Sequence, residues 1–275
     1  MNNKKRILVL SSLANSLINF RGDFIKSLIK QGYEVYAGAP EFSKETLKEV
    51  KDLGAIPLTY YLQRTGLNPF KDFKSILELK KLISTNKIDL VFPYTVKPVI
   101  YGSIAANMNK TAVISLITGL GFAFTGLTFK ARTLQKFNEF LYKLSIRKNK
   151  KIVFQNSDDY QLFLDRKIIS ENHKIGFVSG SGVNLEQFKT RVNQNTTGII
   201  SFVIVARLIK EKGIDLFIDA AQELKTKYPK AEFHIIGGPD KSPSAIKLEK
   251  LNMLHDKGII VYHGVQKNVP EHLFK

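Results

Sequence analysis

Short apolar runs alternate with segments of helical apolar spacing along almost the whole of this 275-residue chain. Several runs are near-continuous in Val, Ile, Leu and Phe, which is typical of parallel strands covered on both faces. Parallel strands need crossover connections, so the alternation predicts an α/β protein with Rossmann-like, doubly wound parallel sheets. The predicted strands are Ile7–Ser12, Glu34–Ala39, Ile56–Tyr61, Leu90–Tyr94, Val113–Thr118, Ile152–Gln155, Ile175–Val178, Ile200–Ala206, Glu232–Gly237 and Ile259–His263.

The segment from Lys189 to Gly198, KTRVNQNTTG, separates two series of predicted strands. It is polar, rich in Asn and Thr, and without hydrophobic periodicity, and an apolar run follows it directly. We therefore predict two domains, residues 1–190 and 191–275, the second with three strands.

The residue types present exclude several kinds of site. The chain has no Cys, which rules out disulfides, thiol catalysis and Cys–metal sites. Its five His show no metal-ligand spacing, so we expect no bound metal. The adjacent Asp158 and Asp159 resemble a metal carboxylate pair, but we read them as acids at a helix start with Ser157 as the N-cap. No apolar run is long enough to span a bilayer, and the charged N-terminus leads into a run too short for a signal peptide, which favours a cytoplasmic location.

The charge is strongly positive and unevenly distributed. Residues 1–150 hold 24 basic and 10 acidic side chains, out of 42 and 24 in the whole chain. A localised basic excess suggests an anionic partner such as nucleic acid, an anionic membrane surface or a phosphorylated substrate; a solvated lysine-rich surface is the alternative.

One segment concentrates this charge. Residues 130–151 hold eight basic residues and one acidic residue, and Leu134, Phe137, Leu141 and Leu144 share one helical face. Basic amphipathic helices bind membrane surfaces, whereas an ordinary domain helix would pack its apolar face into the core. Both hold if the apolar face packs inward and the basic residues lie over anionic lipid.

The segment VARLIKEKGI begins where a strand ends and a helix starts. In open α/β sheets, ligands bind beyond the carboxyl ends of strands, and a helix N-terminus attracts anions. Arg207 and Lys212 place two cations beside Gly213, which suits a diphosphate, although a charged surface turn would look the same.

Two further strand ends carry candidate ligand contacts. At the end of the fourth predicted strand lie Tyr94, Thr95 and Lys97, where ligand contacts are expected. Tyr94 could equally be an aromatic side chain packed in the core. The loop GLGFAFTG at 119–126 follows the fifth and is not the dinucleotide fingerprint, because its third glycine falls too late. Its glycines either allow close approach to a substrate or permit a tight turn.

These segments carry a resemblance to a known family. VARLIKEKGIDLFIDAAQELKTKYPKAEFHIIGG resembles the donor-domain signature of family 4, the retaining, nucleotide-sugar-dependent glycosyltransferases of GT-B fold. The family's crossover segment is similar to SGSGVNLEQF. Its N-terminal helix and second strand are similar to FRGDFIKSLIKQGYEVYAGAP. YTVKPVIYGSIAA and ISLITGLGFAFTG resemble a subgroup that builds lipid-linked surface polysaccharides. The signature residues present are Arg207, Leu208, Glu211, Lys212, Gly213 and Gly237.

The resemblance implies transfer of a sugar from a nucleoside diphosphate sugar, expected to be a UDP-sugar, to a polyprenyl-diphosphate-linked saccharide, with retention and without a metal or other cofactor. It places the protein at the inner face of the plasma membrane and needs no nucleic acid. It assigns the donor diphosphate to Arg207 and Lys212 and leaves the catalytic residue unknown. The implied donor-side loop residues are Gly213, Gly237 and Gly238, and the implied acceptor-side residues are Asn15, Ser16, Asn19, Arg21, Tyr94, Thr95, Lys97, Thr118, Gly119 and Gly121.

Other functions stay open at this point. A sugar-nucleotide epimerase would share the fold but needs an acid/base cluster, and none is evident. An inactive binding protein and a nucleic-acid-binding protein are further alternatives, although no RRM, KH or helix-turn-helix signature occurs.

The C-terminal part departs from the family pattern. Relatives continue with further βα units and a pair of Glu separated by seven residues. The Glu residues after Gly198 are 211, 223, 232, 249 and 271, and none of them differ by eight. We therefore expect an incomplete donor domain that binds nucleotide sugar weakly, turns over little and tends to aggregate unless a partner supplies the rest. The alternative is a compact variant that closes its sheet with the strands present.

Overall fold

The computed structural model describes residues 4–63, 68–119, 129–189, 198–240, 242, 244–266 and 268–273. Its strands are β1 Arg6–Leu10, β2 Glu34–Ala39, β3 Ile56–Thr59, β4 Leu90–Pro93, β5 Ala112–Ile117, β6 Lys151–Phe154, β7 Ile175–Phe177, β8 Ser201–Val205, β9 Glu232–Ile236 and β10 Val261–Tyr262. Its helices are α1 Ala14–Lys30, α2 Lys44–Asp52, α3 Pro69–Thr85, α4 Val96–Met108, α5 Phe129–Ile146, α6 Ser157–Asp165, the 3₁₀ turn Lys210–Lys212, α7 Ile214–Lys227, α8 Leu248–Asp256 and α9 Val269–Leu273. The ten strands predicted from the sequence are confirmed, with ends shifted by one or two residues.

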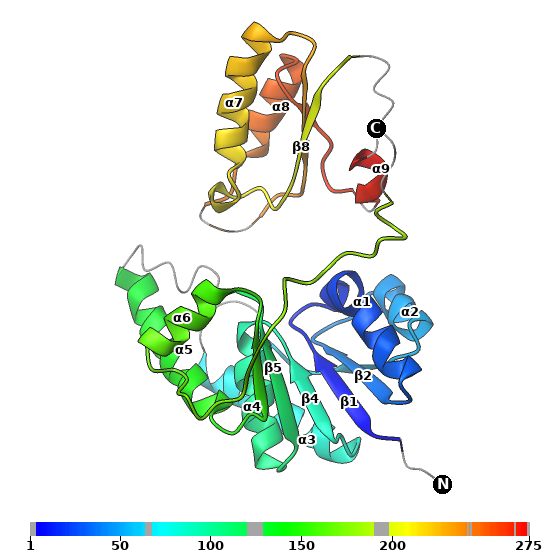
Figure 1. Ribbon diagram of the computed structural model, residues 1–275, viewed down its shortest axis with the longest axis vertical. Helices are drawn as coiled ribbons and strands as arrows, with labels where there is room; N and C mark the ends of the chain where they lie inside the picture. Colours follow the sequence, from blue (N-terminus) through cyan, green and yellow to red (C-terminus); the bar gives the residue numbers. More distant parts are fainter. Residues whose placement is uncertain are drawn as a thin grey trace. The chain divides into compact units, whose positions relative to one another are not determined.

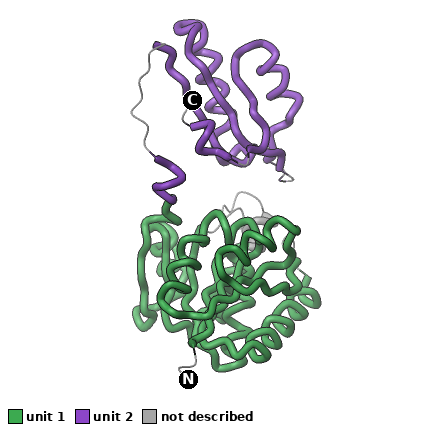
Figure 2. Tube along the Cα trace, turned by 90° about the vertical axis from the view of Figure 1, so that its right-hand side faces the viewer, with its two compact units in different colours: residues 1–183 green, residues 184–275 purple. Residues whose placement is uncertain are grey.

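The described chain divides into two compact units, residues 1–183 and 184–275 (Figure 2). The sequence pattern favoured a division at 190–191, within residues that the structure leaves undescribed. Within the second unit, the Asn184 side chain accepts hydrogen bonds from the backbone N–H groups of Glu186 and Gln187, at 2.9 and 3.2 Å, and so closes a local turn.

The first unit is a doubly wound sheet. Its described strands are all parallel, in the order β3-β2-β1-β4-β5-β6-β7 (Figure 1). The chain moves one way from β1 to β3 and the other way from β4 to β7. Because such crossovers are right-handed, α1 and α2 cover one face and α3, α4 and α5 the other. Contacts between α1 and α2, and of α4 with both α3 and α5, agree with this arrangement.

Strand β1 shows how sequence alternation builds two cores. Ile7 and Val9 pack into the cluster that includes α1, whereas Leu8 and Leu10 pack into the cluster on the other face. Successive side chains of a strand point to opposite faces, so an apolar run is required where both faces are covered. Burying each such side chain stabilises the unit by about 1.5–3 kcal/mol.

The second unit contains a parallel sheet of order β10-β9-β8 among its described residues. Ile214, Ile218 and Ala221 of α7 are buried in one cluster with Phe233 and Ile235 of β9. These residues form the apolar face by which α7 packs on the sheet.

Helix α5 corrects one expectation. An inward-facing apolar side of Phe137, Leu141 and Leu144 was one reading, but Phe137 and Leu144 are exposed and Leu141 is only half-buried. The buried side carries Tyr142 and Ile146 together with polar residues, among them Asn138 and Ser145. The predicted face also included Leu134, whose side chain lies outside the described part.

The start of α6 corrects a second one. Ser157 was expected to cap this helix, but the N-cap is Asn156, whose Oδ1 accepts from the Asp159 backbone N–H at 2.7 Å. Asp158 and Asp159 lie in the first turn, as expected for acids beside the positive end of the helix dipole.

Candidate active site

The carboxyl ends of β1 and β4 meet at the switch point of the first sheet. β1 lies between β2 and β4, and the crossovers leave these strands in opposite directions. Two hydrogen bonds join the loops that follow them: Thr95 Oγ1 to Ser12 Oγ at 3.2 Å, and the Tyr94 hydroxyl to Ser16 Oγ at 3.1 Å. Ligands of doubly wound sheets bind at this point, so the structure brings Ser16, Tyr94 and Thr95 to one place where a ligand is expected.

Thr95 holds a strained backbone at this point. It stands at the N-cap of α4 with φ 67° and ψ 157°, a region populated almost only by glycine. A β-branched residue there costs about 1–3 kcal/mol, which the surrounding contacts offset. Strain of this kind clusters at functional sites.

This strain predicts an unusual order of stability for two substitutions of Thr95. Thr95→Gly should be more stable than Thr95→Ala by about 1 kcal/mol, because both lose the hydrogen bond to Ser12 but only glycine adopts this backbone freely. Elsewhere the order is normally the reverse. Thermal unfolding of the two variants decides it, and a more stable alanine variant would show that the backbone here is relaxed.

Arg21 lies inside the fold. It is 6% exposed on α1, and its guanidinium carbon lies 4.8 Å from the centroid of the Tyr94 ring. Its Nη1 donates to the Phe20 carbonyl at 2.6 Å, and its Nε has no hydrogen-bond partner among the described residues. Burial lowers the pKa of Arg21 and raises that of Tyr94. The pair thus forms a buried cation–aromatic contact beneath the switch point.

The other acceptor-side candidates are placed as follows. Lys97 Nζ contacts Asp72 Oδ1 at 3.2 Å and the Gln63 carbonyl at 2.7 Å, so its ammonium is already satisfied within the unit. Asn15 and Asn19 are exposed on α1, and Thr118 and Gly119 are half-buried after β5, where Gly119 has φ +123°. Gly121 lies outside the described residues.

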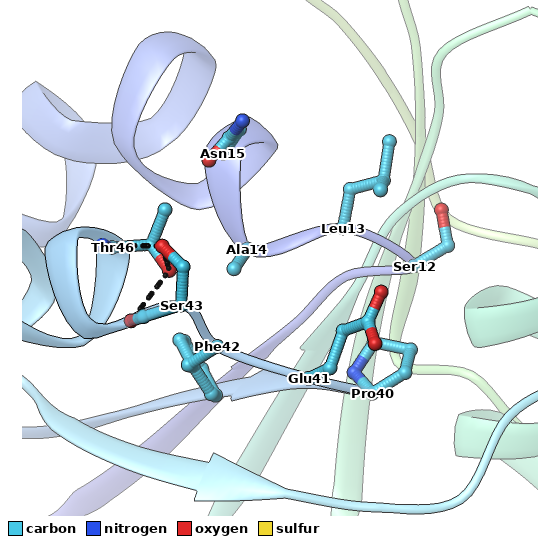
Figure 3. A pocket seen from close by; sticks show the side chains of 9 residues that line it. All are labelled: Ser12, Leu13, Ala14, Asn15, Pro40, Glu41, Phe42, Ser43 and Thr46. Atoms are coloured by element: carbon cyan, nitrogen blue, oxygen red, sulfur yellow. Dashed lines mark hydrogen bonds between the residues drawn. The ribbon is translucent and has the colours of Figure 1, made fainter.

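A cavity of about 350 Å³ opens between the loops that follow β1 and β2. Figure 3 shows Asn15 at the start of α1, with Glu41 and Ser43 on the facing loop. Leu13 at the N-cap of α1 supplies no side-chain hydrogen bond to the helix, so the first turn, whose Ala14 and Asn15 line the cavity, has no side-chain cap. The lining residues are Ser12, Leu13, Ala14, Asn15, Pro40, Glu41, Phe42, Ser43 and Thr46.

Sequence reasoning missed the residues from Pro40 to Thr46. A signal for them existed, because they follow the second strand and β2 is the sheet neighbour of β1. Ser12 and Glu41 both lie at carboxyl ends of these adjacent parallel strands, where ligand contacts are expected.

In the second unit, Arg207 and Lys212 flank the turn between β8 and α7. Lys212 is exposed at the end of the 3₁₀ turn, and Arg207 has a side chain that is 67% exposed. Gly213 joins the turn to α7 with φ +74°, a conformation that favours glycine, and α7 has no side-chain cap. Two cations therefore lie near the open N-terminus of a helix.

Two carboxylates adjoin these cations. Asp240 Oδ2 lies 3.3 Å from Arg207 Nη1. Glu211 Oε2 accepts a hydrogen bond from Ser244 Oγ at 2.6 Å, which lowers the pKa of Glu211. Glu211 is therefore ionised near neutral pH. Because Asp240 already pairs with Arg207, an anion that binds Arg207 must compete with the Asp240 carboxylate.

Gly237 and Gly238 follow β9 beside this turn. A Cβ built on Gly237 would lie 1.9 Å from the Ala206 carbonyl oxygen, so this position admits glycine alone without a backbone shift. On Gly238 the nearest atom would be Val265 Cγ2 at 2.5 Å, at the end of an exposed side chain.

Among the described residues, no group of three or more His, Asp or Glu is arranged to hold a metal ion. None of the helices in the described part has an apolar stretch long enough to cross a bilayer.

Comparison with known proteins identifies the family. The family model described as Glycosyl transferase 4-like matches residues 6–156, more than half of the chain. This chain belongs to the family 4 glycosyltransferases. The model described as Glycosyl transferases group 1 matches residues 186–275 of this glycosyltransferase, the part that holds Arg207 and Lys212. The resemblance seen in its sequence motifs is confirmed.

Similarities to individual proteins agree with this family assignment. This glycosyltransferase is 29% identical over 278 residues to the N,N'-diacetylbacillosaminyl-diphospho-undecaprenol alpha-1,3-N-acetylgalactosaminyltransferase of Campylobacter jejuni, and the match covers 97% of this chain and 71% of that protein. Its fold matches a glycosyltransferase of Rickettsia africae with a TM-score of 0.69 at 16% identity, over 98% of this chain and 70% of that one. It also matches Anabaena HepE in complex with UDP and glucose, with a TM-score of 0.67 at 14% identity, over 98% and 72% of the two chains. These likenesses confirm the GT-B fold.

Proposed function

We propose that this glycosyltransferase moves a sugar from a UDP-sugar to a hydroxyl of a lipid-diphosphate-linked saccharide, with retention of anomeric configuration. The observation that carries the proposal is the pair Arg207 and Lys212 at the open N-terminus of α7, in a chain of this family. The name of the Campylobacter relative describes an undecaprenol-diphosphate-linked acceptor and N-acetylgalactosamine as the sugar. The Anabaena neighbour holds UDP. UDP-N-acetylhexosamines are therefore the first donors to test.

The donor chemistry explains the need for cations. The bond between the anomeric carbon and the diphosphate oxygen breaks, the acceptor hydroxyl oxygen bonds to that carbon, and the hydroxyl proton passes to the departing diphosphate. Negative charge grows on the departing diphosphate as this bond breaks, so it is larger in the transition state than in the bound donor. Fixed charges aimed at it therefore lower the barrier more than they tighten ground-state binding. Arg207 can hold the diphosphate by two hydrogen bonds, while Lys212 acts as a point charge.

For the acceptor saccharide we propose the cavity between the β1 and β2 loops. Ser12, Asn15 and Glu41 supply donors and acceptors for sugar hydroxyls, and Leu13 and Phe42 offer apolar surface for the sugar ring. The cavity adjoins the switch point through Ser12, which also contacts Thr95.

Glu41 provides a direct test of this acceptor site. Glu41→Ala should raise the KM for the acceptor about tenfold while leaving the KM for the donor unchanged, because a hydrogen bond to a charged group is worth about 1.5–3 kcal/mol. Glu49→Ala is the matched control, an exposed glutamate of α2 outside the cavity. Equal effects of the two substitutions, or a change in the donor KM alone, would remove the acceptor from this cavity.

The proposed reaction is tested with UDP-N-acetylhexosamines and a polyprenyl-diphosphate-linked sugar. We expect acceptor-dependent UDP release, a product one sugar heavier by mass spectrometry, and an unchanged anomeric configuration by NMR. EDTA should leave the rate unchanged, since the proposal uses no metal. Conversion of the UDP-sugar without acceptor would indicate an epimerase instead, and donor binding without any turnover would indicate an inactive binding protein.

A further inference from the structure

Two helices of the first unit repeat one exposed apolar pattern, Phe-x₂-Phe-x₃-Leu. In α3 the pattern occurs at Phe70, Phe73 and Leu77, and in α5 at Phe137, Phe140 and Leu144. Their side chains are between 42% and 88% exposed. Residues three and seven apart share a helix face, so each helix carries one continuous apolar stripe open to its surroundings.

Both stripes lie on the outer side of one helical layer. In α3 the buried residues are Ser75, Leu79 and Ile83, which fall on the face opposite Phe70. In α5 the side opposite Phe140 is likewise the buried one, with Asn138 and Tyr142. Both helices contact α4 on the same face of the sheet (Figure 1). We call the six residues together the two-helix apolar surface.

The charges around this surface have one sign. Among the described side chains of α3 and α5, every exposed charged residue is a lysine, and Arg147 and Lys148 follow α5 directly. The acidic residues of these helices are partly buried, and each forms an ion pair. The pairs are Asp72 with Lys97 at 3.2 Å, Glu78 with Lys74 at 3.9 Å, and Glu139 with Arg166 at 3.8 Å. The exposed lysines are Lys71, Lys74, Lys81, Lys136 and Lys143.

We infer that the two-helix apolar surface docks the protein on an anionic lipid bilayer. Phenylalanine and leucine side chains would enter the region between headgroups and acyl chains, while the surrounding lysines contact lipid phosphates. An anionic bilayer fits this surface because it combines two layers. Its negatively charged headgroups can contact the lysines, and its apolar interior can accept the phenylalanine and leucine side chains. The inference deepens the proposed function, since a lipid-linked acceptor is held in a membrane.

Sedimentation with vesicles tests the docking without any sugar substrate, so its outcome is independent of whether sugar transfer occurs. The 275-residue chain should bind phosphatidylcholine vesicles that contain phosphatidylglycerol, and should bind pure phosphatidylcholine vesicles at least about tenfold more weakly. Added salt should weaken the binding. No binding to either vesicle, or equal binding to both, overturns the inference.

Substitutions then locate the contact. Changing either triad to serine, Phe70/Phe73/Leu77 or Phe137/Phe140/Leu144, should lower vesicle affinity about tenfold, because apolar area no longer enters the bilayer. Changing Lys143, Arg147 and Lys148 to glutamine should weaken binding to anionic vesicles. Circular dichroism checks that each variant is folded, which the exposure of these residues leads us to expect. Full binding by both triad variants would contradict the inference.

Tryptophan reporters give a second, independent reading. The chain has no Trp, so Phe140→Trp and Phe20→Trp each introduce one fluorophore. The two positions are matched in exposure, at 61% and 57%, but Phe20 lies on α1, on the opposite face of the sheet. Anionic vesicles should shift the emission of Phe140→Trp to the blue and leave that of Phe20→Trp unchanged. A shift at Phe20 alone, or at neither position while the chain is bound, would overturn the assigned surface.

Discussion

Replacing Lys212 by alanine is expected to lower the rate of sugar transfer by about 10²–10³-fold, because one charge aimed at the departing diphosphate is removed. Arg207→Ala should have a comparable effect. The loss should appear in kcat as well as in kcat/KM, since the negative charge on the diphosphate is larger in the transition state than in the bound donor. Stability should be unaffected, because both side chains are exposed.

Lys210 provides the matched control for this prediction. It lies in the same 3₁₀ turn as Lys212, is also an exposed lysine, and carries the same charge. Lys210→Ala should keep nearly the full rate if the effect belongs to the diphosphate site, and should match Lys212→Ala if only the net charge matters. Steady-state kinetics of the active protein, with thermal unfolding of each variant, separates these cases. A normal rate for Lys212→Ala would remove it from the donor site.

Replacing Gly237 by alanine is expected to destabilise the second unit by about 3 kcal/mol, the upper range for forcing extra atoms into a packed interior. The new Cβ would lie 1.9 Å from the Ala206 carbonyl oxygen, and a backbone oxygen cannot rotate away. The backbone on both sides is held in place: Ala206 N–H donates to Ile236 at 3.0 Å, and Gly237 N–H donates to Gly264 at 2.9 Å. Hydrogen exchange should show lost protection in β8 and β9 while the first unit stays protected.

The adjacent glycine is the control. A Cβ on Gly238 meets the end of the Val265 side chain, which is 73% exposed and can turn aside. Gly238→Ala should therefore cost about 1 kcal/mol or less. If the two substitutions destabilise the unit equally, the close approach of Ala206 is not the reason why glycine is required after β9.

Local patterns in the sequence predicted most of the fold. All ten strands were readable because each is a short apolar run between segments of helical spacing, and parallel strands buried on both faces require such runs. The turn at Gly213 and the acids at the start of α6 were likewise visible, because glycine at positive φ and Asp beside a helix N-terminus are local requirements. The family motif between Val205 and Gly237 is contiguous along the chain, and the match to the family model agrees with it.

Features made by distant segments were not readable in this way. The cavity combines the loops after β1 and β2, which become neighbours only in the sheet. Arg21 was expected among the ligand contacts, but the structure places it in a buried stack on Tyr94, seventy-three positions along the chain.

The orientation of α5 shows the physical reason most clearly. By sequence alone its apolar stripe had two readings, the face that packs into the core and a face that meets a membrane surface, because either environment takes apolar area out of water. In the structure the apolar residues Tyr142 and Ile146 of α5 are buried instead, and neighbouring elements supply partners for polar groups beside them: Asn107 Nδ2 of α4 donates to the Ser145 carbonyl, and Asn149, just after the helix, donates to Ser103 and Ser115, each at 3.1 Å. A buried polar group is stable only when such partners are present, and they come from α4 and β5. The sequence by itself therefore determined which elements form, whereas the tertiary packing of Tyr142 and Ile146, with hydrogen bonds for the polar groups beside them, decided which face of α5 is buried and which is left open.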